Sequence, residues 1–139
     1  MSLLGVLKGT ELAKQIDQSM EAELRGVGMY YALAYLANEK GYSEVAKTLE
    51  HIANDEARHA GLYSVLNGHV QEDIFATLAQ FAQVESNAEA RILAFAETVR
   101  KLGQEEAALE IEATAKDEGR HGVLLQALVE KHGNPKKRH

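Results

Sequence analysis

Apolar residues recur at intervals of three and four along most of the chain, and alternation with a period of two is nearly absent. Such spacing is typical of amphipathic α-helices that each carry one apolar stripe. Segments that contain glycine follow the periodic runs at 40–43, 67–70 and 102–104, where they act as helix-stop signals. We therefore predict an all-α protein with helices near 10–39, 43–66, 71–101 and 104–131.

The second half of the chain repeats the first with a shift of 62 positions. This shift aligns Gly41 with Gly103 and Asp-Glu-Ala-Arg-His (55–59) with Asp-Glu-Gly-Arg-His (117–121). Each repeat is one helical hairpin, and a hairpin alone cannot bury both of its apolar stripes. We predict that the two hairpins pack as a four-helix bundle, with one domain over residues 1–132 and a flexible basic tail at 133–139.

Composition excludes several classes of protein. The 139 residues include no Cys, which rules out disulfides, thiolate metal sites, iron–sulfur clusters and a cysteine nucleophile. Charged residues interrupt every apolar run, and the first residues lack the pattern of a secretory signal, so we expect a cytoplasmic protein without a membrane span. The net charge of −6, with scattered basic residues, indicates no nucleic-acid partner.

Each apolar stripe is interrupted near its middle by carboxylate or imidazole side chains. Unpaired carboxylates are costly to bury, and no Lys or Arg falls on the stripes at this level, so we expect metal ions as the counter-charge. Glu and His at i and i+3 share one helical face. One Glu from each of two helices plus Glu-x-x-His from each of the other two is the ligand set of dinuclear carboxylate bundles. The predicted ligands are Glu23, Glu56, His59, Glu85, Glu118 and His121.

Other polar residues allow two interpretations. Asp55 and Asp117 precede ligand glutamates, so they either accept the outer N–H of a ligand histidine across the bundle or lie on the surface. Tyr30 is either a core residue or a hydrogen-bonding or redox-active neighbour of the metals. Glu89 is either a fifth carboxylate or a solvated residue that flanks the stripe. The other histidines are expected at the surface: His51, His69, His132 and His139.

The sequence resembles the rubrerythrins of the ferritin-like superfamily. The resemblance is carried by Leu7-Lys-Gly-Thr10, Glu23 with Tyr30 seven residues later, Asp-Glu-Ala-Arg-His-Ala (55–60), Glu85, and Asp-Glu-Gly-Arg-His (117–121). It implies a site with two iron ions held by the six ligands above, with Glu56 and Glu118 as bridging, catalytic carboxylates. It also implies a peroxidase that reduces hydrogen peroxide to water and protects oxygen-sensitive cells from oxidative stress.

Two departures from the rubrerythrin pattern are evident. Ala88 occupies the position where rubrerythrins usually carry a further ligand glutamate, and no Cys-rich rubredoxin domain is present, so electrons would come from a separate protein such as a rubredoxin. The ligand types alone also accept Mn or Zn. Two further functions therefore stay open: oxidation of Fe(II) by O₂ in iron handling, and a metal-stabilised bundle without turnover.

The connection between the second and third helices predicts the assembly. In a ferritin-like bundle these helices are parallel, yet a linker of about five residues reaches only roughly 17 Å, whereas a 24-residue helix spans about 36 Å. Three solutions exist: a plain up-down-up-down bundle, unwinding of the second helix near Gly61, or a hairpin-swapped homodimer. We expect the homodimer, in which each site takes Glu23, Glu56 and His59 from one chain and the other three ligands from its partner.

Overall fold

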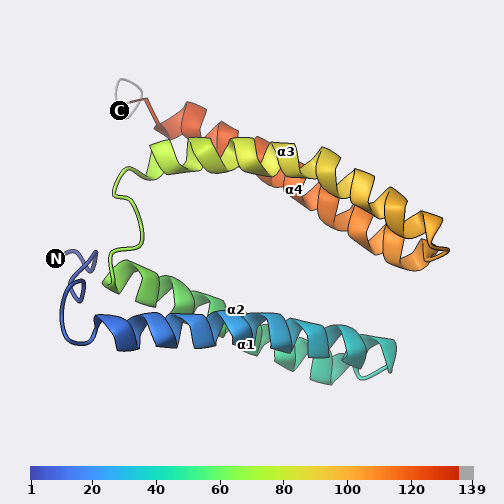
Figure 1. The fold of residues 1–139 in the computed structure, drawn as a ribbon, viewed down its shortest axis with the longest axis horizontal. Coiled ribbons are helices and arrows are strands. Elements are labelled where there is room, and N and C mark those ends of the chain that lie inside the picture. The colour runs from blue at the N-terminus through green and yellow to red at the C-terminus, as the bar shows by residue number, and fades with distance from the viewer. Residues whose placement is uncertain (135–139) are drawn as a thin grey trace. The chain divides into compact units, whose positions relative to one another are not determined.

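The structure is a computed structural model that describes residues 1–134, and it confirms the all-α class (Figure 1). Its helices are α1 (Ala13–Glu39), α2 (Ser43–Leu66), α3 (Ile74–Lys101) and α4 (Glu105–His132). Every helix begins and ends within three residues of its predicted boundary. No strand occurs in the described residues, and none of their helices is both long and apolar enough to cross a membrane. Most of the predicted flexible tail, 135–139, lies outside the described residues.

The chain divides into two compact units, Met1–Gln71 and Glu72–His139, which match the two sequence repeats. Helix α1 packs on α2 in the first unit, and α3 packs on α4 in the second. Each hairpin turns at a glycine with a positive φ, 80° at Gly41 and 81° at Gly103. This conformation strains residues with a side chain, so the aligned glycines end α1 and α3 at equivalent points. The predicted duplicated hairpins are therefore confirmed.

Small residues form the contact between the two helices of each hairpin. The buried apolar side chains are all alanines, with a seven-residue spacing at Ala46, Ala53 and Ala60 in α2. Helix α4 repeats this spacing at Ala108, Ala115 and Gly122. A Cβ added to Gly122 would lie 3.2 Å from the carbonyl oxygen of Ala82, which shows how closely the backbones approach. The sequence analysis did not single out these positions, although their heptad spacing was the available signal.

Large apolar residues of the predicted stripes remain exposed in each hairpin. The exposed fractions of Val45, Ile74, Phe81, Phe95 and Leu128 lie between 46% and 60%, and none of the large side chains in residues 1–134 is fully buried. The helical periodicity predicts these residues for the core between two packed hairpins, and a single hairpin leaves them uncovered. The physical reason is that one helix covers only one side of its neighbour. Each hairpin therefore presents a further apolar face.

The first residues of the chain anchor the carboxyl end of α2. Backbone N–H groups of Gly5 and Leu7 donate to the carbonyl oxygens of Val65 and Leu66, at 2.8 and 2.9 Å. Both carbonyls lie in the last turn of the helix, where no N–H group of the helix itself reaches them; Val65 O also accepts from Gly68 N at 3.1 Å. Helix α2 thus continues regularly through Gly61 to Leu66, and the alternative in which it unwinds near Gly61 is wrong.

A polar cluster ties the residues after α2 to the beginning of α1. The buried Asn67 amide donates to Asp17 Oδ1 at 2.6 Å, and His69 Nε2 lies 2.7 Å from the same oxygen. The hydrogen bonds from Asn67 and His69 lower the pKa of Asp17. His69 N also donates to Ser64 O at 2.9 Å, so residues 67–69 stay at the end of α2. Only residues 70–73 then remain to span the distance to α3.

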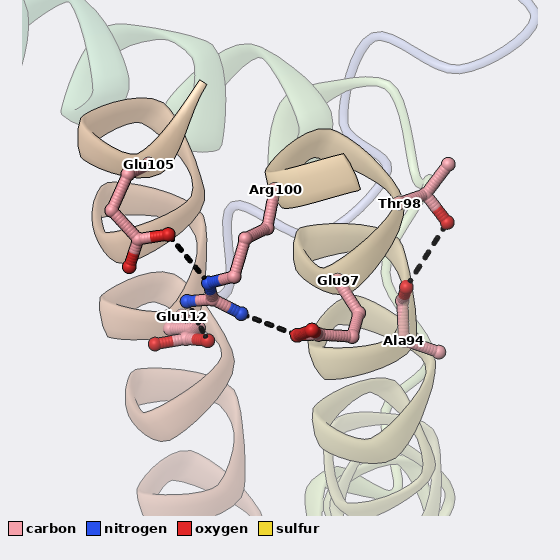
Figure 2. Close-up of polar contacts among 6 residues, drawn as sticks. All are labelled: Ala94, Glu97, Thr98, Arg100, Glu105 and Glu112. Carbon is pink, nitrogen blue, oxygen red and sulfur yellow. Dashed lines mark hydrogen bonds and ion pairs between the residues drawn. The ribbon is translucent and has the colours of Figure 1, made fainter. Parts of the chain in front are cut away.

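Arg100 at the end of α3 binds two carboxylates of α4 and one of its own helix (Figure 2). Its guanidinium donates to Glu105 Oε2 at 2.8 Å, to Glu112 Oε1 at 2.6 Å and to Glu97. These partners, Glu112 first, raise the pKa of Arg100 above its ordinary value. The Arg100 and Glu112 side chains are only 27% and 26% exposed, so this pair is better shielded from water than an ordinary surface ion pair, whereas Glu97 and Glu105 are more than half exposed.

Arg100→Met should lower the melting temperature by a few degrees, measured by circular dichroism at low salt. The change keeps the apolar stem but leaves three neighbouring carboxylates without their shared cation, and they repel one another. Lys101→Met is the matched control, because Lys101 is exposed and forms no ion pair with another described residue. Equal melting temperatures for both variants would show that the network does not stabilise the hairpin.

Candidate metal centre

The first unit brings together three of the six predicted ligands. Glu23 on α1 and the pair Glu56 and His59 on α2 each offer one donor atom, and these atoms all lie within 4.8 Å of one another. His59 Nδ1 is 3.5 Å from Glu23 Oε1. The carboxylates are partly buried, whereas the His59 side chain is 51% exposed. Because Glu56 and His59 are three residues apart on one helix, α2 turns both toward the same small volume.

Two observations test whether this trio fits a metal ion. Glu23 Oε2 is buried and has no hydrogen-bond partner among the described residues, which is costly for a carboxylate oxygen unless a cation approaches it. Gly26 makes room for the Glu56 carboxylate, since an added Cβ would lie 3.3 Å from Glu56 Oε2. Carboxylate oxygens and an imidazole nitrogen are ligands for divalent iron, manganese and zinc. The donor set therefore fits such an ion.

The second unit repeats the arrangement at positions shifted by 62. The donor atoms of Glu85 on α3 and of Glu118 and His121 on α4 also lie within 4.8 Å of one another. His121 Nδ1 is 3.8 Å from Glu118 Oε2 and 3.9 Å from Glu85 Oε2. Ala88, the counterpart of Gly26, is buried on α3, about one helical turn after Glu85. Each hairpin therefore carries two carboxylates and one imidazole at the same level.

The two aspartates next to the ligands pair with arginines on their own helices. Arg58 donates to Asp55, and Arg120 Nη2 lies 3.0 Å from Asp117 Oδ1. Both aspartates are more than half exposed. Their predicted role, accepting an N–H from a ligand histidine across the bundle, stays a prediction.

The remaining candidates lie at different depths. Tyr30 is half-buried on α1, two helical turns beyond Glu23. Glu89 is not among the three donors of the second trio, and its carboxylate lies beside Gly119, so its role as a fifth carboxylate stays a prediction. Exposure at His51, His69 and His132 agrees with their expected surface position, and His139 lies outside the described residues. The sequence analysis missed Gly26, whose only signal was its alignment with a small residue, Ala88.

Each trio alone supplies fewer donors than a transition metal normally binds. Two oxygens and one nitrogen leave at least one coordination position open on a tetrahedral ion and three on an octahedral one. The two trios together contain four carboxylates and two imidazoles. This total equals the ligand set of dinuclear carboxylate bundles.

Comparison with known proteins supports this interpretation for one part of the chain. Residues 14–80 match the rubrerythrin family model, a segment that contains Glu23, Glu56 and His59. A segment of 42 residues is 45% identical to an uncharacterized protein of Methanocaldococcus jannaschii, and the match covers 30% of each of the two chains. No solved structure matches the chain. The resemblance to rubrerythrins is therefore confirmed over residues 14–80.

Proposed function

We propose that the two trios join into one di-iron centre and that the chain is a rubrerythrin-type peroxidase. The observation that carries this proposal is the repetition of a Glu, Glu and His trio in both hairpins. The four carboxylates of both trios together balance the charge of two divalent ions. The two carboxylates of a single trio balance only one such ion. The rubrerythrin match over residues 14–80 supports iron as the metal.

The length of the linker supports assembly of this centre between two chains. Helix α2 has 24 residues and is about 36 Å long. Since His69 is bonded to the end of α2, five residue steps lead from it to Ile74, and they reach roughly 17 Å. A linker of this length cannot return along the bundle to start a parallel α3. In the proposed homodimer, the first trio of one chain meets the second trio of its partner, and the apolar faces cover one another.

The proposed reaction consumes two electrons and two protons for each hydrogen peroxide, which yields two water molecules. When bound, the iron ions supply the two electrons and polarise the peroxide oxygens. Glu56 and Glu118, which the resemblance makes the bridging carboxylates, would hold the ions together with Glu23, Glu85, His59 and His121, and the half-buried Tyr30 hydroxyl would hold a proton near the centre. An external protein such as a rubredoxin would restore the electrons.

Reaction rates with two oxidants test the proposed activity. In stopped-flow measurements, the Fe(II)-loaded protein should be oxidised at least about 10-fold faster by hydrogen peroxide than by O₂ at equal concentration, because the proposed centre is a peroxidase. Faster oxidation by O₂, followed by release of Fe(III), would assign the chain to iron handling instead. No oxidation by either reagent, with zinc retained after purification, would assign a structural metal site.

A further inference from the structure

A small cavity lies between α1 and α2, apart from the first metal trio. Tyr31, Ala34, Tyr35, Asn38 and Glu50 line it, and its volume is about 120 Å³. An engineered cavity of about 150 Å³ in another protein holds benzene, which has six heavy atoms. The cavity near Glu50 is therefore large enough for a planar group of four heavy atoms.

The second repeat shows which group occupies the equivalent place there. The shift of 62 positions aligns Asn38 with Arg100 and Glu50 with Glu112. In the second unit, Arg100 Nη2 donates to Glu112 Oε1 at 2.6 Å (Figure 2). In the first unit, Asn38 is too short to do the same, and the half-buried Glu50 forms no hydrogen bond or ion pair with another described residue. The first unit thus keeps the carboxylate, at Glu50, but has no counterpart of the Arg100 guanidinium that binds it in the second unit.

The charge around the cavity favours a monovalent cation. Arg100 in the second unit is surrounded by three carboxylates, of which Glu97 and Glu105 align with Tyr35 and Ser43 in the first unit. Glu50 is consequently the only carboxylate that lines the cavity. A cation with one positive charge neutralises the Glu50 carboxylate. A divalent ion would keep one positive charge that no lining residue balances.

The aromatic lining favours a planar cation over a compact one. Tyr31 and Tyr35 both border the cavity, and the Tyr31 hydroxyl donates to Asn54 Oδ1 at 2.6 Å, which restrains its ring. A guanidinium stacks on aromatic faces and forms two parallel hydrogen bonds with a carboxylate, while an ammonium does neither as well. Shape, charge and lining therefore agree on one chemical class.

We propose that this cavity binds a monovalent alkylguanidinium group through the Glu50 carboxylate, beside the rings of Tyr31 and Tyr35. The shared chemistry is that of an arginine side chain, whether it belongs to a small molecule or to a peptide. The proposal is independent of the metal centre, because none of the lining residues is a proposed metal ligand.

An NMR titration with methylguanidinium at constant ionic strength tests the proposal. Amide shifts near Asn38 and Glu50 should saturate with a dissociation constant on the order of millimolar, and methylammonium should bind at least about 10-fold more weakly. Glu50→Gln should abolish saturation, whereas Glu112→Gln, the matched change in the other repeat, should not. Linear shifts with methylguanidinium, equal affinity for methylammonium or unchanged binding in Glu50→Gln would each overturn it.

A second variant tests the comparison between the repeats directly. Asn38→Arg should supply the guanidinium from within the chain, lower the affinity for methylguanidinium at least about 10-fold and raise the melting temperature. Asn38→Gln is the control and should leave binding intact. Unchanged affinity in Asn38→Arg would overturn the proposal. Agmatine represents a small-molecule source of the guanidinium, and a blocked Gly-Arg-Gly peptide represents a peptide source. The source that the cavity accommodates should bind at least as tightly as methylguanidinium, and the other should bind more weakly.

Discussion

Glu118→Ala is expected to abolish binding of two metal ions and the reduction of hydrogen peroxide. The change removes a carboxylate that we place between the two ions, together with one of the four negative charges that balance them. Changes in residues that only support a ligand already lower metal affinity about 10- to 100-fold, so loss of a bridging ligand should exceed 100-fold. Metal analysis after gel filtration and a peroxidase assay with a reduced rubredoxin measure the two effects.

Glu56→Ala should behave in the same way, because Glu56 occupies the equivalent position in the first repeat. His51→Ala is the matched control: it changes an exposed residue of α2 that belongs to neither trio, and metal content and turnover should stay intact. Two metals per site in purified Glu118→Ala would show that this carboxylate does not bridge the ions.

Removal of the metal should lower the melting temperature by on the order of 10 °C or more. Ligands that bind only the folded state at 1,000 times their dissociation constant stabilise it by about 4 kcal/mol, and each kcal/mol shifts a domain of this size by several degrees. Loss of the ions also leaves the carboxylates facing one another, including the buried Glu23 Oε2. Scanning calorimetry before and after dialysis against a chelator gives the comparison.

Restoring Fe(II) or Zn(II) to the chelated protein should recover the original melting temperature. The same treatment of Glu118→Ala should produce little change, because that variant has lost the site already. An unchanged melting curve after confirmed removal of the metal would contradict the proposed contribution of the ions to stability.

The helix ends were predictable from the sequence because local signals determine them: Gly41 and Gly103 end α1 and α3 through their positive φ. Helix α3 begins three residues after its predicted start, because Asp73 caps it by accepting a hydrogen bond from Ala76 N at 3.0 Å. The Glu and His pair of each trio was also predictable from a local signal. Residues at i and i+3 lie on the same face of a helix, so the two side chains come together whatever the helix packs against.

Contacts between distant residues were not predictable in this way. Asn67 and His69 meet Asp17 about 50 positions away, and no local pattern marks that cluster. Arg100 was overlooked because it lies at the end of α3, away from the level of the metal ligands, yet it organises three carboxylates. The small-residue contact within each hairpin was not predictable from the apolar stripes, because large apolar residues define the stripes and these residues remain exposed on each hairpin.

Mixed dimers test the central claim, a di-metal centre shared between two chains. A Glu56→Ala chain and a Glu118→Ala chain are refolded together, and heterodimers are isolated with two different affinity tags. In the swapped homodimer, one site of each heterodimer carries both substitutions and the other carries neither, so the heterodimer should bind two metal ions and regain turnover. If each chain built its own centre, every site would carry one substitution, and verified heterodimers without metal or turnover would contradict the account.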